Sequence, residues 1–528
     1  MSVATIISRV TGLLRDAIMA YVMGTMLLSS AYIVSNNIPN MIFELVAGGV
    51  LSAVFIPIFI DRIQRADEQE AWRFASSIFN LAMIGLGIMA VLGTVFARAF
   101  MRTQMIDFTG PDAARSLAIG TFFFGFFAIQ VVIYGAHAIG TGILNSYRRF
   151  LAPAVAPIFS NLFMIAVFLG LFLPFRDSNP GLAVTLLAIG TTLGVLVMLL
   201  TLVPSLIRLG IRYSPTIDLH DPAVRNLGRK MIATTIYVAT NLVGLSFRNS
   251  YAWRAVAGGH GPAAVRYAWM FYQLPYGVFA VAIATAFLPE LATAASTDDT
   301  TGFKRQYMTG LKATGLLMIP AAALLIGLAE PLVTLLRSGR FTAADVPLVA
   351  SVLRFWALGL FSFAAYMFTL RSFYALQDTR TPTITNIPGT VLQVALYSVF
   401  TLGIGAWHGL GLAGIGAADA AFYTLHFIVL WAILRHRLGP MNARAFVSSV
   451  GRVLLASIVA GAAAWYAASL LQPVAGATRL GFLLQLVVGG SVGVVIAFGL
   501  STLMRVPELG VAMSMVRRAL KRPSPGSA

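Results

Sequence analysis

Long apolar runs separated by short polar segments recur along the whole chain. A run of about 20 apolar residues is long enough to cross the hydrocarbon core of a membrane as a helix. Windows of that length predict spans at residues 3–23, 28–60, 74–100, 116–140, 153–174, 181–207, 231–255, 266–295, 310–335, 346–370, 383–405, 411–434, 446–471 and 480–504. The pattern therefore predicts an all-α polytopic membrane protein with about fourteen transmembrane helices.

The first predicted span combines an apolar face with a polar one. At 100° per residue, its polar and small positions fall within one arc of about 160°. These positions are Thr5, Ser8, Arg9, Thr11, Gly12, Arg15 and Asp16. A charged side chain at the centre of a membrane helix costs about 2.5–3.5 kcal/mol on insertion scales. We therefore expect this helix to line a cavity. The alternative is an interfacial helix, or an Arg-Asp pair that only locks packing.

Polar side chains at membrane depth also occur in three other predicted spans. Asn40 and Glu44 belong to a stripe that recurs every four residues in the second span. Asn241 and Arg248 share a face of the seventh span, and Gln273 lies in the eighth. We expect these helices to surround a wet, net-cationic cavity together with the first. Polar packing between helices is the alternative interpretation.

Three sequence landmarks recur at one offset of 232 residues, which indicates an internal duplication. The pairs are Gly12 with Gly244, Pro57 with Pro289, and Arg148 with Arg380. Six spans per copy is an even number, so both copies would begin on the same side of the membrane. The sequence therefore predicts two parallel six-helix repeats, followed by two C-terminal helices.

The repeat also suggests a division of the chain. We expect an N-lobe at residues 1–210, a C-lobe at 211–439, two further helices within 440–508 and a basic cytoplasmic tail at 509–528.

Composition supports the membrane assignment and explains the basic charge. Hydrophobic residues make up 58% of the chain, charged residues 11%, and the mean hydropathy is +0.83, which excludes a soluble domain. With the N-terminus in the cytoplasm, the inside loops and tail hold 23 Lys and Arg residues and the outside loops hold nine. This bias predicts that both termini are cytoplasmic. Most of the net charge of +18 then reflects orientation, so we expect no nucleic-acid partner.

Catalytic and metal-binding patterns are missing from the sequence. The chain has no cysteine, and its six histidines show no metal-ligand spacing. Gly409, Gly411 and Gly414 match a dinucleotide-binding fingerprint, but they open a membrane span with no preceding soluble strand. We therefore expect no cofactor, no metal and no enzymatic activity.

Several sequence words together resemble those of one family. They are residues 8–16 (SRVTGLLRD), 38–40 (IPN), 53–57 (AVFIP), 339–342 (GRFT) and 373–382 (FYALQDTRTP). The chain resembles the MurJ/MviN family of the MOP superfamily, the lipid II flippases of bacterial cell-wall synthesis. This resemblance covers nearly the whole chain. It implies a multi-pass protein of the bacterial cytoplasmic (inner) membrane, with a groove for the polyprenyl tail at the two C-terminal helices.

The resemblance also implies a substrate and roles for the polar residues. The substrate would be an undecaprenyl-pyrophosphate-linked peptidoglycan precursor, moved between leaflets by alternating access. Arg9, Arg15 and Arg248 would bind the pyrophosphate, while Asp16 and Glu44 would orient them. Asn40, Asn241 and Gln273 complete the list of expected binding residues. Expected partners are the lipid-linked precursor, membrane lipids and cell-wall synthesis proteins.

The chain departs from the family at three positions. Family members usually carry basic residues where this sequence has Phe43 and Met270, and an acidic residue near Ser30. We expect Arg248 to replace the cation missing at Met270. Three alternatives follow: a flippase for another polyprenyl-linked oligosaccharide, a cation-coupled drug exporter of the same superfamily, and a non-transporting scaffold of wall synthesis.

Overall fold

The computed structural model is helical throughout the part of the chain that it describes. It describes residues 2–44, 55–64, 68–106, 108–475, 478–506 and 508–510. Within these ranges two isolated β-bridges occur and no strand. The all-α fold class is therefore confirmed.

Contacts group the chain into two compact units. Unit 1 contains Met1–Arg266 and Ser338–Thr342, and unit 2 contains Tyr267–Arg337 and Ala343–Ala528. The predicted lobe boundaries stay a prediction. Most of the predicted tail, residues 511–528, lies outside the described residues.

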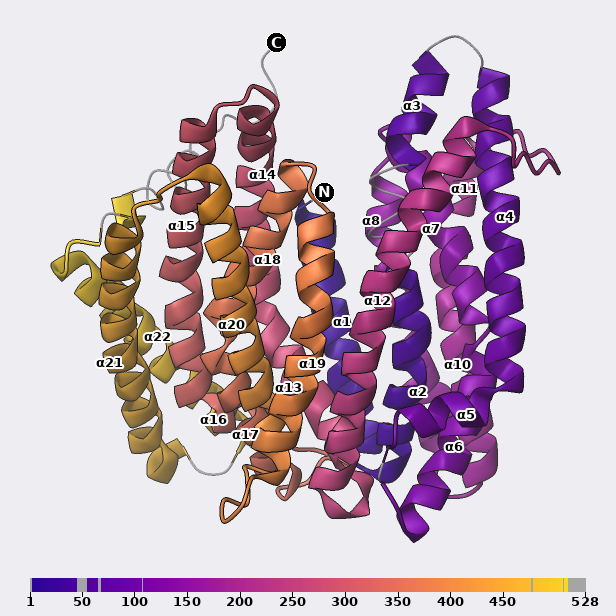
Figure 1. Cartoon of the computed structure of the whole chain (residues 1–528). Coiled ribbons are helices and arrows are strands. Elements are labelled where there is room, and N and C mark those ends of the chain that lie inside the picture. Colours follow the sequence, from indigo (N-terminus) through magenta and orange to yellow (C-terminus); the bar gives the residue numbers. More distant parts are fainter. Residues whose placement is uncertain are drawn as a thin grey trace, which may run out of the picture. The chain divides into compact units, whose positions relative to one another are not determined.

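Unit 1 contains the following helices, most of which are labelled in Figure 1. They are α1 (Ser2–Met23), α2 (Leu27–Glu44), α3 (Ile56–Gln64), α4 (Glu68–Val95), α5 (Ala97–Thr103), α6 (Pro111–Phe127), α7 (Gln130–Ser146), α8 (Leu151–Ala166), η2 (Val167–Phe172), α9 (Leu173–Phe175), α10 (Pro180–Leu200), α11 (Val203–Ile207), α12 (Pro222–Ala255), η3 (Ala257–Gly259) and the first turns of α13 (Gly261–Pro275).

Unit 2 contains the rest of α13 and the remaining helices. They are η4 (Tyr276–Ala280), α14 (Val281–Ser296), α15 (Thr300–Gly327), α16 (Ala329–Thr334), α17 (Asp345–Leu358), α18 (Leu360–Ala375), α19 (Arg380–Leu402), α20 (Ala413–Leu438), α21 (Ala443–Ala475) and α22 (Arg479–Leu503).

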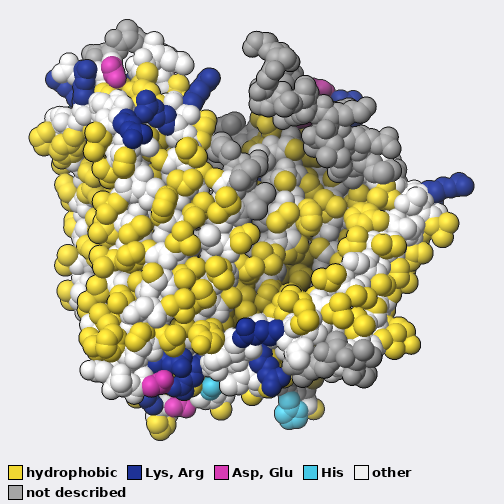
Figure 2. All heavy atoms as spheres, turned by 180° about the vertical axis from the view of Figure 1, so that it is seen from behind, with side chains coloured by type: hydrophobic (Ala, Val, Ile, Leu, Met, Phe, Trp, Pro, Cys, Tyr) yellow, Lys and Arg dark blue, Asp and Glu magenta, His cyan; other side chains and the backbone are white. Residues whose placement is uncertain are grey.

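Thirteen of the predicted spans coincide with a helix or with consecutive helices. The second span, 28–60, begins in α2 and ends in α3, and its residues 45–54 lie outside the described residues. In the described residues, nine helices are long and apolar enough to cross a membrane, and α17 and α18 together form a tenth candidate bent by 52°. The helix α1, which carries three charged residues, is not among these candidates. The count of fourteen therefore stays a prediction. The face seen in Figure 2 is mostly hydrophobic across its middle, with charged side chains toward the two ends.

A turn of the same conformation supports the duplication. Arg148 and Gln377 both have a positive φ, 57° and 58°, which non-glycine residues rarely adopt. Arg148 lies in the four-residue turn between α7 and α8, and Gln377 lies in the four-residue turn between α18 and α19. The structural equivalent of Arg148 is thus Gln377, three residues before the sequence match at Arg380.

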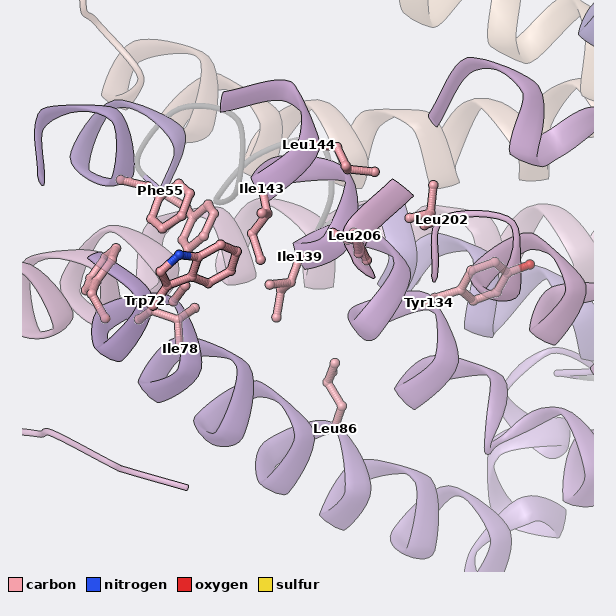
Figure 3. Packing of buried hydrophobic residues seen from close by; sticks show 14 of the residues in the cluster. Phe55, Trp72, Ile78, Leu86, Tyr134, Ile139, Ile143, Leu144, Leu202 and Leu206 are labelled. Carbon is pink, nitrogen blue, oxygen red and sulfur yellow. The ribbon is translucent and has the colours of Figure 1, made fainter. Parts of the chain in front are cut away.

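Each unit has its own hydrophobic core. In unit 1, side chains from α3, α4, α7, α10 and α11 pack together around Phe55, Trp72 and Ile139 (Figure 3). In unit 2, Phe303 and Phe373 belong to a second cluster that joins α14, α15, α18 and α20. The core of unit 1 includes residues of α7 and α8, two of the helices that carry the polar residues described below.

Candidate anion-binding site in unit 1

Arg15 and Asp16 on α1 form an ion-pair cluster with Arg266 from the first turns of α13. One carboxylate oxygen of Asp16 accepts hydrogen bonds from Nε and Nη2 of Arg15, at 3.0 and 2.8 Å. The other oxygen accepts a hydrogen bond from Nη2 of Arg266 at 2.8 Å. One acid therefore orients two guanidinium groups.

Asn161 on α8 holds the opposite side of Arg15. Its Oδ1 accepts a hydrogen bond from Nη1 of Arg15 at 3.1 Å, and its Nδ2 donates to Oγ1 of Thr11 at 3.2 Å. Gly12 lies beside this contact, and an added Cβ there would make an ordinary van der Waals contact of 3.6 Å with Nδ2 of Asn161. Asn161 thus fixes the polar face of α1 against α8, a role that the sequence did not indicate.

Two contacts from α2 and its preceding turn hold the start of α13. The backbone N–H of Ala263 donates to Oγ of Ser30 at 3.2 Å, and Nδ1 of His260 lies 3.3 Å from Oγ1 of Thr25. The first N–H groups of a helix have no acceptor within the helix. The hydroxyl of Ser30 supplies an acceptor for one of them. Ser30, near which the resemblance implies an acid, therefore helps to place the helix that carries Arg266.

Arg266 is the main residue that sequence reasoning missed. It lies at the edge of an apolar run, where the charge distribution assigns it to an outside loop. It precedes Met270 by four residues, so the two positions share one face of α13, one turn apart. The helix therefore carries a cation one turn before Met270, the position at which the resemblance implies one. The signal available in the sequence was this spacing of four residues.

The cluster carries an excess of positive charge that is open to solvent. The side chains of Arg15 and Arg266 are each 31% exposed, whereas that of Asp16 is 8% exposed. Two guanidinium groups and one carboxylate leave one uncompensated positive charge. Such a charge at membrane depth is costly unless an anion balances it. The exposed edges of the guanidinium groups can bind a phosphate or pyrophosphate through paired hydrogen bonds.

The predicted binding residues of α2 are partly described. The Oδ1 atom of Asn40 accepts a hydrogen bond from the hydroxyl of Tyr134 at 2.8 Å, and its Nδ2 donates to the backbone carbonyl of Asn36 at 2.8 Å. This contact ties α2 to α7. The side chain of Glu44 lies outside the described part of the structure, as does that of Phe43.

The remaining predicted residues do not contact the cluster through any described ion pair or hydrogen bond. Arg9 is exposed on α1, and Asn241 is half-buried on α12. Arg248 is half-buried, and its Nε has no hydrogen-bond partner among the described residues. Gln273 is half-buried and belongs to unit 2. The expectation that Arg248 replaces the cation missing at Met270 stays a prediction.

A short segment from between α16 and α17, Ser338–Thr342, packs on the end of α1 within unit 1. The backbone N–H of Arg340 donates to the carbonyl of Tyr21 at 2.9 Å. Gly24 and Gly339 have φ of 61° and 57°, and a Cβ on either would lie 2.3 Å from a backbone oxygen of the other segment. Close backbone contact therefore requires glycine at both positions, which fixes the end of α1.

A salt bridge reinforces this contact. The guanidinium of Arg340 pairs with the carboxylate of Asp177. A hydrogen bond from Arg176, together with the Arg340 pair, holds the pKa of Asp177 below its usual range. Among the described residues, no group of three or more potential metal ligands lies together.

The fold defines the class of protein. A solved MATE family multidrug resistance transporter of the MOP superfamily, in an inward-facing conformation, aligns with a TM-score of 0.67 and 20% identity, covering 82% of this chain and 94% of its own. A lipid II flippase MurJ in an inward closed conformation aligns with a TM-score of 0.74 and 21% identity. The alignment covers 94% of this chain and 97% of the MurJ chain. The chain thus has the helical fold of MOP superfamily transporters. Sequence identities of 20–21% establish the fold and nothing further.

The sequence comparison gives the family. The family model described as lipid II flippase MurJ matches residues 19–487, so the chain belongs to this family. A probable lipid II flippase MurJ of Haemophilus influenzae is 29% identical over 490 residues, 88% of this chain and 90% of that protein. A probable lipid II flippase MurJ of Rhizobium meliloti is 27% identical over 531 residues, which cover 98% of this chain and 95% of that protein.

Family membership confirms the predicted resemblance and the assignment to transporters rather than enzymes. The chain is a multi-pass protein of the bacterial inner membrane. The three alternatives are not favoured by these comparisons. The matched range begins at residue 19, so Arg15 and Asp16 precede it and their roles are argued from the geometry.

Proposed function

We propose that this protein flips lipid II from the cytoplasmic to the outer leaflet by alternating access, and that Arg15 and Arg266 hold its pyrophosphate. The observation that carries the proposal is the pair of partly exposed guanidinium groups on one buried carboxylate. Guanidinium groups bind phosphate oxygens through charge-assisted, bidentate hydrogen bonds. The relatives named as probable lipid II flippases support the choice of substrate.

Asp16 has a specific part in this mechanism, because it occupies the place between the two guanidinium groups in the absence of ligand. Arg15 contacts the carboxylate through two nitrogens, whereas Arg266 contacts it through one. The contact of Arg266 is therefore the easier one to exchange for a pyrophosphate oxygen. When the ligand leaves, Asp16 takes the guanidinium back, so Arg266 has a hydrogen-bonded anionic partner in both states.

Other residues extend the site in this proposal. The unpartnered Nε of Arg248 offers a further donor for an anion, and Arg9 adds positive charge on α1. Asn40, Asn241 and Gln273 remain proposed contacts of the polar headgroup, and Glu44 a proposed orienting acid. A groove at α21 and α22 for the polyprenyl tail is likewise part of the proposal.

The proposed topology places both termini in the cytoplasm, on the basis of the 23 to nine distribution of Lys and Arg. Cell-wall synthesis proteins remain proposed partners, since they produce and consume the lipid-linked precursor.

Rescue of bacteria depleted of their own lipid II flippase tests the function. We expect the wild-type protein to restore growth and to return newly made lipid II to the outer leaflet, measured by its accessibility from outside. A protein that inserts at normal levels but leaves lipid II in the inner leaflet would overturn the proposal.

A further inference from the structure

A pocket of about 380 Å³ lies between α15, α17 and α21 of unit 2. The three helices pack in one bundle, and α15, α17 and α21 are labelled in Figure 1. Seven of the lining residues are apolar and one is charged. They are Ala323, Ile326, Gly327, Arg354, Ile458, Gly461, Ala462 and Trp465.

Close contact between α15 and α21 forms the floor of the pocket. A Cβ on Gly327 would lie 2.6 Å from the backbone oxygen of Gly461, and a Cβ on Gly461 would lie 2.8 Å from that of Ala323. The backbones therefore touch at these glycines. The helix α22 packs against the same pair through Gly489, which adjoins Ala464 and Leu328, and it contributes no residue to the pocket.

Arg354 is the only charged residue of the pocket, and its guanidinium has spare hydrogen-bonding capacity. Its Nη2 contacts Oε2 of Glu330 at 3.3 Å, and the two side chains are 41% and 65% exposed. The described residues provide no other hydrogen-bond partner for this guanidinium. A pair this exposed adds little stability, so a stronger anion can displace Glu330.

Two exposed aromatic residues of α21 lie at the pocket or directly beside it. Trp465 lines the pocket, and Trp465 and Tyr466 are both 58% exposed on α21. Exposed Trp and Tyr side chains concentrate at the boundary between hydrocarbon and headgroups. Arg354 and Glu330 lie at the same end of the bundle, next to the end of α15. The pocket thus has a cation and an exposed aromatic residue beside an apolar floor, a combination that is typical of a site at headgroup level.

We propose that this pocket binds an anionic glycerophospholipid, with its phosphate on Arg354 and one acyl chain along α15 and α21. The phosphate replaces the weak contact with Glu330, and Trp465 covers the glycerol region. Under the proposed topology the lipid belongs to the outer leaflet. A polyprenyl chain would fill the apolar floor but would offer Arg354 no anion stronger than Glu330, and free phosphate would leave the floor empty.

Native mass spectrometry of the purified full-length protein, titrated with phosphatidylglycerol or phosphatidylcholine of identical acyl chains, tests this proposal. We expect Arg354→Gln to weaken phosphatidylglycerol binding about tenfold and to leave phosphatidylcholine binding unchanged. Ala462→Leu, which fills the floor, should weaken both lipids. Arg435→Gln, which removes an exposed arginine elsewhere in unit 2, is the matched control and should change neither.

Glu330→Gln keeps the test informative even if Arg354→Gln folds poorly. It removes the competing carboxylate, so we expect tighter phosphatidylglycerol binding, a gain that misfolding cannot produce. Unchanged phosphatidylglycerol binding in both Arg354→Gln and Glu330→Gln would overturn the proposal. Displacement of phosphatidylglycerol by equimolar undecaprenyl phosphate or inorganic phosphate would overturn it too, in favour of a polyprenyl or simple anion site. These readouts need no transport, so their failure would leave the proposed flipping activity untouched.

Discussion

Two buried carboxylates, Asp16 in unit 1 and Asp419 in unit 2, are satisfied in opposite ways. Asp16 is 6% exposed and lies between two guanidinium groups that are themselves partly open to solvent. Asp419 is 3% exposed and accepts hydrogen bonds from uncharged donors alone in the described structure. The cluster around Asp16 has more positive than negative charge, whereas the donors around Asp419 carry no charge.

The surroundings of Asp419 explain what a closed network does. Its oxygens accept from Nε1 of Trp356 at 2.8 Å, from Nε2 of Gln393 at 2.9 Å and from the hydroxyl of Tyr397. These donors come from α17 and α19, while Asp419 lies on α20. A fully satisfied network of this kind rigidifies the helices that it joins. We conclude that burial of an acid is common to both sites, and that surplus exposed cations distinguish the proposed binding site.

The largest expected effect is the loss of function in Arg15→Ala. Removing one partner of a desolvated charge pair costs about 2–5 kcal/mol, so binding of the substrate should fall roughly thirtyfold or more. We expect no rescue of flippase-depleted cells, with normal insertion and folding. Arg15→Lys should rescue partly, because an ammonium cannot reproduce the paired contacts of guanidinium. Normal growth of Arg15→Ala at wild-type expression would show that the cluster only packs the helices.

A relocated cation sharpens the comparison. Arg266→Met should abolish rescue, and adding Met270→Arg should restore part of it, because the two positions share one face of α13. The control is Met270→Arg alone, which should leave growth unchanged. If the double variant is folded but inactive, transport requires a cation at residue 266 beside Asp16, and a cation elsewhere on the same face of α13 is not sufficient.

Asp419→Asn should lower stability and spare transport. The amide presents N–H groups to donors that need an acceptor, which should cost about 1–3 kcal/mol of folding free energy. We expect a lower midpoint of thermal unfolding in detergent and unchanged lipid II flipping per folded molecule. A variant of wild-type stability that does not transport would instead make Asp419 part of the transport mechanism, and the contrast with Asp16 would fail.

The smallest effect is expected from Tyr134→Phe. It removes one hydrogen bond to Asn40 between α7 and α2, worth about 0.5–1.5 kcal/mol. We expect a slightly lower unfolding midpoint with normal rescue. A strong loss of rescue at wild-type stability would show that Asn40 and Tyr134 contact the substrate, as the sequence suggested for Asn40.

The sequence predicted the helical spans because membrane burial imposes a simple rule of length and polarity on each helix. It also selected Arg15 and Asp16, since charges inside an apolar run require an explanation. It missed Asn161 and Arg266 for a physical reason. Asn161 is a single amide on an apolar helix, and Arg266 lies at the edge of a run, so neither has a local signal. Their roles depend on which helices pack against α1, and this packing is a tertiary property.

Binding of undecaprenyl pyrophosphate to the purified protein tests the central claim most directly. The wild-type protein, Arg15→Ala, Arg266→Ala and Asp16→Asn should be compared, with Arg435→Ala as the control and undecaprenyl monophosphate as the second ligand. We predict weaker binding in both arginine variants, tighter binding in Asp16→Asn because the competing carboxylate charge is gone, and a preference of the wild type for pyrophosphate. Equal binding of both ligands to all five proteins would contradict the account.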